Sequence, residues 1–593
     1  MTDRRNSIVE RRGSQVSSYP SRRTSIIPEL QGIEKPNIEK LPDNLDCDVL
    51  IVGTGLVESI LAAALSWQGS KVLHIDSNNY YGDNVANLTI EQTKNWFINS
   101  KLNRTGFRCY KNIKLEINDT DFKIVSKDYG IDLSPKILFT KSPMLDLLLK
   151  SRVYNYLEFQ SLSDFHTFED DSFGKLVSSK EDIFTSETLT LVDKRKLMKF
   201  LKFIVSEDYD GSKISNDINL KEYLTTVFKL VEKYADELIY TLGLINNPEI
   251  GALDGLYYIR RYLLSLNIYG NFPTLYSKYG GPGEISQAFC RSAAVAGTIY
   301  KLGTSIESYD NKSQIANLTD GSTIKVNEKV VSSLNQSYAK PIDCKFHEIS
   351  RMILVVDKGC ELWINDNESS SIVVFPPNSL KTNNKYPVEV LIMGTGTGCC
   401  PPGQCIWYLH TIEPLNGERD LQAALEKMEE SYIKEHNFDY DNFEEGDFAN
   451  NGNSLNESGI GKLSQSLNKL SSTIGKKGVI NYILKLQFTQ LTNINQTLPF
   501  GYDDIVHKTS EGIIIPAMPS GEMSYDGIIE EAKKIYKEIV GDDVDFFDVD
   551  FEDEEEEVEV ENDIDAVAGE AQKRVTGELD QSAQEDNLFE LNM

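Results

Sequence analysis

The sequence contains little of what a disulfide-linked or metal-binding protein needs. Of its 593 residues, 8 are cysteine and 6 are histidine, and neither type recurs at a paired spacing. Such scattered cysteines are typical of a reducing compartment. The densest group, Cys399, Cys400 and Cys405, has no second arm of ligands and fits a turn between two strands better. We therefore expect no metal site.

Long apolar runs are also missing. No stretch approaches the roughly 18 consecutive apolar residues of a membrane-spanning helix. The N-terminus is rich in Arg and Ser and lacks the apolar segment of a secretory signal. We therefore expect a cytoplasmic protein.

Basic residues are scarce as well. The chain has 60 Lys+Arg against 91 Asp+Glu, a formal net charge of −31. A nucleic-acid-binding protein needs a basic face, so that class is disfavoured. Neither a P-loop nor a Gly-x-Ser-x-Gly motif occurs, so phosphoryl transfer and serine-based hydrolysis have no recognisable residues to carry them.

Most of the net negative charge lies in the C-terminal tail. Residues 541–593 contain 21 acidic and 2 basic side chains, which predicts a disordered acidic tail. Residues 1–45 predict a disordered basic arm, in which paired arginines precede Ser7, Ser14 and Ser25. These serines are candidate phosphorylation sites, because an acidic kinase groove binds such arginines and a phosphate would invert the local charge. A solvated arm without regulation is the alternative.

The first folded segment has the pattern of a β-α-β unit. Residues 47–52 form a short apolar run with β-branched side chains, and the turn Gly53-Thr-Gly55 interrupts it. The helix-forming segment 59–67 follows, and residues 71–76 predict a second buried strand. An α/β fold with a parallel sheet is the expected result.

The hydrophobic periodicity divides the rest of the chain into segments. We expect the first part of the sheet domain at residues 46–140. The pattern of residues 141–250 is mostly helical and predicts an inserted helical domain. Residues 251–540 complete the sheet domain, with helices and strands alternating to about residue 400. A loop is expected at 270–283, and a disordered insertion at about 440–475.

The first turn carries an incomplete dinucleotide-binding motif. Gly53 and Gly55 are present, and Asp76 ends the second strand where a ribose-binding acid would lie. Glu58, however, replaces the third glycine. A carboxylate beside the helix N-terminus occupies the favourable anion position and would repel a diphosphate. We therefore expect no bound FAD or NAD.

Two blocks of sequence together resemble the GDI/Rab escort superfamily. The resemblance is strong over residues 46–300 and loose over 300–540. It implies a flavoprotein-like, GDI-like sheet domain whose FAD site is degenerate. The matching residues are Gly53-Thr-Gly55-Leu-Val-Glu58, Asn79-Tyr80-Tyr81-Gly82, Tyr279-Gly-Gly-Pro-Gly283-Glu284-Ile-Ser-Gln287-Ala-Phe289-Cys-Arg291 and Gly297-Thr-Ile-Tyr300.

Phe184 and Arg195 indicate which branch of the superfamily this is. They resemble the escort-type segment that docks onto the Rab geranylgeranyltransferase α/β heterodimer, and aromatic and Arg residues often dominate small interfaces. An escort protein is not itself an enzyme. It binds a new Rab GTPase in the GDP form, presents it for prenylation, and carries the geranylgeranylated product to a membrane that it contacts transiently.

Other interpretations of the same residues stay open. Phe184 could pack into a helical core, and Arg195 could be a solvated helix residue. A Rab GDP-dissociation inhibitor is the alternative function, and a flavin-dependent oxidoreductase is less favoured.

The resemblance also implies a Rab-binding surface made by Tyr81, Glu284 and Arg291. A tyrosine with an acid and an arginine suits a polar interface with a folded GTPase. The alternative is that Glu284 caps its own helix and pairs with Arg291 two turns later. The chain departs from the pattern at Lys301, where dissociation inhibitors have methionine.

The prenyl group should be accommodated by apolar surfaces of the helical domain. Burying a lipid chain gains about 0.8 kcal/mol per CH₂. The same amphipathic stripes are expected of ordinary helical core, and the sequence does not separate the two roles. The candidate residues are Met144, Leu148, Leu197, Phe200, Leu201 and Ile204.

Overall fold

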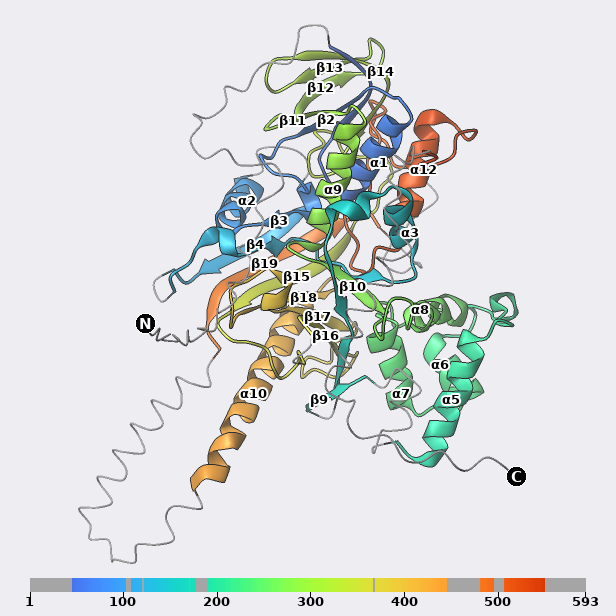
Figure 1. Cartoon of the computed structure of the whole chain (residues 1–593), viewed down its shortest axis with the longest axis vertical. Coiled ribbons are helices and arrows are strands. Elements are labelled where there is room, and N and C mark those ends of the chain that lie inside the picture. The colour runs from blue at the N-terminus through green and yellow to red at the C-terminus, as the bar shows by residue number, and fades with distance from the viewer. Residues whose placement is uncertain are drawn as a thin grey trace, which may run out of the picture. The chain divides into compact units, whose positions relative to one another are not determined.

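A computed structural model provides the structure (Figure 1). The chain divides between Phe547 and Asp548 into two units, and every element below belongs to the first. Phe184, Ser7, Ser14 and Ser25 lie outside the residues that the structure describes, which are 45–102, 108–119, 122–169, 171–176, 189–365, 368–444, 480–494 and 506–549.

The predicted β-α-β unit opens a six-stranded sheet. β1 pairs in parallel with β2 on one side and with β14 on the other, and β11 extends the sheet in parallel beyond β2. β12, β13 and β14 form an antiparallel meander at the opposite edge. In sheet order the strands are β11 (Ile299–Leu302), β2 (Val72–Asp76), β1 (Asp46–Val52), β14 (Thr323–Ser332), β13 (Ile315–Leu318) and β12 (Ile306–Asp310).

Three helices lie together beside this sheet. α1 (Leu56–Trp67) is buried along almost its whole length, and its run of alanines at 62–64 lets neighbouring helices approach closely. α9 (Gly281–Val295) packs along α1, and α12 (Ile528–Val540) also packs against α1 (Figure 1). Because α1 is sandwiched in this way, its N-terminus is enclosed by protein.

The second large sheet has eight strands and is mostly antiparallel, with β16 and β8 paired in parallel. The long helix α10 (Gly417–Glu444) packs against β15, β17 and β18 and covers a core that contains Trp363 and Trp407. In sheet order the strands are β4 (Tyr110–Ile117), β19 (Tyr482–Thr492), β15 (His347–Val356), β18 (Cys405–Thr411), β17 (Val388–Met393), β16 (Ser370–Phe375), β8 (Asp164–Glu169) and β9 (Ser172–Lys175).

Short elements connect these layers. β10 (Thr274–Ser277) lies between β6 (Leu138–Phe139) and β7 (Phe159–Leu162), and β3 (Asn87–Leu88) pairs with β5 (Ile131–Asp132). The other connecting helices are α2 (Ile90–Leu102), α3 (Pro143–Lys150), the 3-10 turns η1 (Asp83–Val85), η2 (Ser126–Asp128), η3 (Val153–Tyr156), η4 (Gly211–Lys213) and η6 (Thr395–Thr397), and the π-helix η5 (Glu237–Leu242). Of the helices described, none is both long enough and apolar enough to cross a bilayer.

The helical layer differs in extent from the segment predicted for it. Residues 141–250 contain strands as well as helices, because β7, β8 and β9 lie within them and β8 joins the large sheet. The layer itself consists of α5 (Leu191–Val205), α6 (Leu220–Val227), α7 (Glu232–Asp236) and η5, and it continues past residue 250 through α8 (Ala252–Ser265) (Figure 1).

A buried ion network connects the helical layer to the rest of the fold. Arg261 of α8 donates hydrogen bonds to Glu522 Oε1 (2.9 Å) and Asp526 Oδ2 (2.8 Å). The guanidinium also lies 4.0 Å from the centroid of the Phe139 ring. Because all three charged side chains are largely buried, their pairing holds α8 against the segment around residue 524.

Two further expectations need correction. Between β11 and β18 the described residues contain strands and a 3-10 turn, not alternating α-helices and strands. The loop expected at 270–283 contains β10 and the start of α9. At the expected insertion of 440–475, α10 continues to Glu444, and the rest of that range lies outside the described residues.

Candidate functional site

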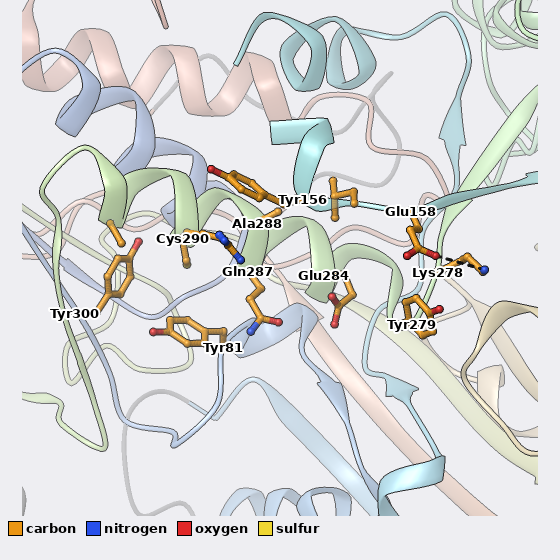
Figure 2. Close-up of a pocket in the computed structure, with 13 residues that line it drawn as sticks. Tyr81, Tyr156, Glu158, Lys278, Tyr279, Glu284, Gln287, Ala288, Cys290 and Tyr300 are labelled. Carbon is orange, nitrogen blue, oxygen red and sulfur yellow. Dashed lines mark ion pairs between the residues drawn. The ribbon is translucent and has the colours of Figure 1, made fainter. Parts of the chain in front are cut away.

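A cavity of about 310 Å³ lies along the outer side of α9, and we call it the α9 pocket. Figure 2 shows α9 crossing it, with Tyr81 and Tyr300 at one end and Tyr279 and the Glu158–Lys278 pair at the other. Its walls come from segments that are distant in sequence. The lining residues are Tyr81, Tyr156, Leu157, Glu158, Lys278, Tyr279, Glu284, Gln287, Ala288, Cys290, Arg291, Ala294 and Tyr300.

The glycine-rich start of α9 lets the helix enter this crowded position. A Cβ on Gly283 would lie 2.8 Å from the backbone nitrogen of Asn87 and 3.0 Å from the carbonyl oxygen of Val85. Pro282 is in the first turn, where its missing N–H costs nothing. The motif quoted from the sequence therefore sets where α9 begins.

The inner face of α9 is bonded to α1 and its preceding turn. Ser286 Oγ donates to the carbonyl oxygen of Thr54 (2.6 Å). Ser59 Oγ lies 2.9 Å from Ser286 Oγ and 3.1 Å from Cys290 Sγ. These buried polar contacts fix the rotation of α9 about its axis, and therefore which residues it turns outward.

The outer face carries two of the three residues predicted to bind Rab. Glu284, Gln287 and Arg291 follow one another at helical spacing and all line the α9 pocket. Tyr81 lines the same cavity although it lies about 200 residues away in sequence. The structure therefore brings Tyr81, Glu284 and Arg291 together.

Aromatic rings close the Tyr81 end of the pocket. The rings of Tyr81 and Tyr300 meet edge to face with centroids 5.8 Å apart, and His74 lies behind Tyr300 at 5.0 Å. Burial raises the pKa of Tyr81 to about 12 and lowers the pKa of His74 to about 4. These groups are therefore uncharged at neutral pH.

Arg291 contacts an aromatic ring. Its guanidinium lies 4.7 Å from the centroid of the Tyr156 ring, and the side chain is exposed. No ion pair between Arg291 and Glu284 is found among the described residues, although the sequence left that pairing open as an alternative. Tyr156 was missed by sequence reasoning, because it lies in no motif.

The opposite end of the pocket is held by the β7–β10 pairing. The backbone nitrogen of Lys278 donates to the carbonyl oxygen of Glu158 (2.9 Å), and their side chains form an ion pair of 3.6 Å. Tyr279 follows with φ +67, an unusual conformation for a bulky residue, and its N–H donates to the Thr397 carbonyl (2.9 Å). Its ring packs on Gly398, where a Cβ would lie 2.5 Å from the ring.

Lys301 does not belong to the pocket. Its side chain is buried and forms an ion pair with Asp320. Successive residues of a strand point to opposite sides, so Lys301 faces away from the cavity that its neighbour Tyr300 lines. The departure from the superfamily pattern at this position therefore leaves the cavity wall intact.

In the incomplete dinucleotide motif, the Glu58 side chain is buried against the glycine-rich turn. Glu58 is 2% exposed, and a Cβ on Gly55 would lie 2.5 Å from its Oε2, so the carboxyl group lies directly against the turn. Burial, followed by the charge of Asp83, raises its pKa well above the ordinary value. Gly53 adopts φ +94 and accepts a bond from His74 at its carbonyl (2.7 Å), if the imidazole proton is on Nε2.

The other acidic residue of the motif is also occupied. Asp76 accepts hydrogen bonds from Thr54 N (2.8 Å) and Thr54 Oγ1 (2.6 Å) at one oxygen. Its other oxygen accepts from Asn78 N (2.8 Å) and Gln336 Nε2 (2.8 Å). A ribose at this position would compete with these four donors for the oxygens of Asp76.

The residues predicted to accommodate a prenyl group are core residues in this structure. Each of the six is at most 6% exposed. Leu197, Phe200, Leu201 and Ile204 of α5 belong to one core cluster, while Met144 and Leu148 lie on α3, which packs near α12. The structure therefore does not bring the two groups together.

Arg195, which is predicted to contact the transferase, lies at the surface of the helical layer. Arg195 is exposed on α5, and Leu191 and Val192 next to it are 74% and 58% exposed. Its predicted companion Phe184 lies outside the described residues.

Cys399, Cys400 and Cys405 are buried where β17 turns into β18, and within the described ranges no cluster suited to a metal is found.

Comparisons with known proteins agree on one family. Residues 43–447 match the family described as GDP dissociation inhibitor. The chain is 43% identical over 573 residues to "Rab proteins geranylgeranyltransferase component A" of Saccharomyces cerevisiae, covering 93% of each chain. It is 44% identical over 554 residues to the protein of the same name from Candida albicans, covering 86% of each.

A solved structure supports the fold. The Rab GDI of Plasmodium falciparum aligns with a TM-score of 0.56 and 18% identity, covering 85% of this chain and 100% of that one. The predicted α/β, GDI-like fold is confirmed.

Proposed function

This chain belongs to the GDP dissociation inhibitor family, and from that premise we propose that it is a Rab escort protein. It binds a newly made Rab GTPase in the GDP form and presents it to the geranylgeranyltransferase heterodimer. It then carries the prenylated Rab through the cytoplasm to a membrane, which it contacts transiently. The observation that carries the proposal is the match, over 93% of both chains, with a relative named component A of that transferase.

The α9 pocket is the proposed GTPase-binding site. Tyr81 and the α9 residues Glu284 and Arg291 line one cavity. These are the three residues for which the superfamily resemblance implies a Rab-binding role. A ring of aromatic groups with an exposed arginine combines the residue types that dominate protein interfaces. The side-chain contacts of Ser286 and Cys290 with α1 and its preceding turn hold this surface ready before a partner arrives.

Arg195 is the proposed contact with the transferase, together with Phe184. Arg195 is exposed on α5, next to exposed Leu191 and Val192. An apolar patch beside a guanidinium is the composition of a small protein–protein contact. The buried network of Arg261 holds the helical layer, and therefore α5, in place.

The chemistry of prenylation is assigned to the partner enzyme. This chain is proposed to be non-catalytic and to bind no FAD, NAD or metal. Two observations support this: the Glu58 carboxyl group lies against the turn, and Asp76 already accepts hydrogen bonds from donors of this chain. Prenyl binding by the α5 stripe would require its buried side chains to move apart. Phosphorylation of Ser7, Ser14 and Ser25 remains a proposal about the basic arm.

The test is reconstituted prenylation. A purified Rab, the transferase heterodimer and labelled geranylgeranyl diphosphate are combined with and without this protein, and the label in Rab is measured. We expect label only when the chain is present, and much less with Arg195→Ala. The matched control is Lys202→Ala, which removes another exposed positive charge from α5 and should leave labelling unchanged.

The alternative function gives a different pattern. A Rab GDP-dissociation inhibitor would bind prenylated Rab but would never support labelling. Equal labelling with Arg195→Ala and Lys202→Ala would remove Arg195 from the transferase contact while keeping the escort function.

A further inference from the structure

Arg291 has an unusual environment for a residue that is expected to bind a partner. Its guanidinium carbon lies 4.7 Å from the centroid of the Tyr156 ring. Among the described residues it forms no ion pair, and the side chain is exposed at the edge of the α9 pocket. Within the part of the chain that the structure describes, the Tyr156 ring is therefore the group that holds the guanidinium.

This contact leaves the hydrogen-bond donors of Arg291 available. The guanidinium lies over the Tyr156 ring and carries five N–H groups, and among the described residues none of them donates a hydrogen bond to an oxygen or nitrogen. Two N–H groups of a guanidinium can donate parallel hydrogen bonds to the two oxygens of one carboxylate, and we call this pair of donors the Arg291 fork. Contact with the ring also limits the rotamers of the long, exposed Arg291 side chain. Without it, the side chain would lose more conformational entropy when a partner binds.

The position of Tyr156 is itself fixed by the scaffold. It is the last residue of η3, which follows Arg152 in a left-handed conformation and packs against α9. Directly after it, β7 pairs with β10, and Phe159 is opposite Ser277. β10 leads through Tyr279 into α9, which carries Arg291, so the β7–β10 pairing connects the segments that carry the two sides of the contact.

We infer that Tyr156 is a positioning residue that holds the Arg291 fork toward a carboxylate on the bound GTPase. The inference rests on the proposed function, because it takes the GTPase to be the occupant of the α9 pocket. Tyr156 acts through Arg291, so its contribution should vanish when the guanidinium is absent. Its hydroxyl has no part in the stack, so phenylalanine should replace it.

The test measures the dissociation constant of a purified Rab GTPase loaded with a fluorescent GDP analogue. Tyr156→Leu should weaken binding by about 2- to 5-fold, which corresponds to the 0.5–1 kcal/mol of an exposed cation–π contact. Tyr156→Phe should bind like the wild type. The matched control is Tyr154→Leu, which alters an exposed tyrosine of the same 3-10 turn that does not line the pocket.

A double-mutant cycle separates positioning from a general structural role. In an Arg291→Ala background, Tyr156→Leu should cause no further loss of affinity. Equal affinities of Tyr156→Leu and the wild type, or a loss that is the same with and without Arg291, would overturn the inference while the proposed function stands. Failure of the wild-type chain to bind the GTPase at all would overturn both.

Discussion

Replacing Glu58 with glutamine should stabilise the fold near and above neutral pH and leave it unchanged in acid. The Glu58 side chain is buried, and its Oε1 has no hydrogen-bond partner among the described residues. Burial is the largest cause of its raised pKa, and the neighbouring carboxylate of Asp83 adds to it. The folded chain therefore keeps a proton that the unfolded chain releases.

The sign follows from proton linkage. Because the folded pKa is raised above the unfolded value, the folded state binds more protons, and the free energy of unfolding falls as pH rises above about 4.5. Each such group contributes up to about 1.4 kcal/mol per pH unit until its folded pKa is reached. Burial raises the pKa of Asp76 and of Glu531 to about 7, so both act in the same direction. Glu58→Gln removes one of these contributions.

The assay is urea unfolding followed by intrinsic fluorescence at several pH values between about 4.5 and 8. The stability gained by Glu58→Gln should be near zero at the acidic end and should grow steadily as pH rises. Glu91→Gln, an exposed substitution on α2, is the control and should follow the wild type throughout. The reasoning is refuted if Glu58→Gln follows the wild type at every pH, or if it destabilises the chain equally at all of them.

Two further substitutions probe the packing around the site. Arg261→Met should lower the free energy of unfolding by about 3–5 kcal/mol, because it leaves the buried carboxylates of Glu522 and Asp526 without their arginine. Arg260→Met alters a half-buried neighbour, and it should lower the free energy of unfolding clearly less in the same urea titration. Gly398→Ala should weaken GTPase binding, because its Cβ would push against the Tyr279 ring at the pocket wall. Gly403→Ala has the same φ of +75 but open space around it, so it should lower stability without changing affinity.

The parts of the fold that could be predicted are those whose strands, turns and helices follow one another directly along the chain. The β-α-β unit at 47–76 has strand, turn and helix next to one another, and β1, α1 and β2 follow it closely. β8 could not be placed, because its parallel partner β16 comes about 200 residues later and no local pattern announces that pairing. β10 has four residues between glycine- and proline-containing segments, which makes it look like a loop.

The site divides in a similar way. Tyr81, Glu284 and Arg291 could be named because they lie in two recognisable blocks, and α9 brings them together. Tyr156 could not, since a single aromatic residue in a short turn carries no pattern; only the packing of η3 on α9 gives it a role. The α5 residues Leu197 to Ile204 show the limit of periodicity, because an amphipathic stripe has the same spacing in a core as in a lipid site.

The α9 pocket and the closed dinucleotide motif are parts of one arrangement. Ser286 bonds to the carbonyl of Thr54, and Ser59 bridges to Ser286, so the inner face of α9 is attached to the turn that would cradle a diphosphate. Loss of these bonds would free α9 to rotate about its axis, and Glu284 and Arg291 would turn with it. The contacts that attach α9 to this turn are therefore the same ones that aim Glu284 and Arg291 outward. A substitution that removed the Ser286 hydroxyl should therefore weaken the proposed GTPase binding although Ser286 itself faces the interior.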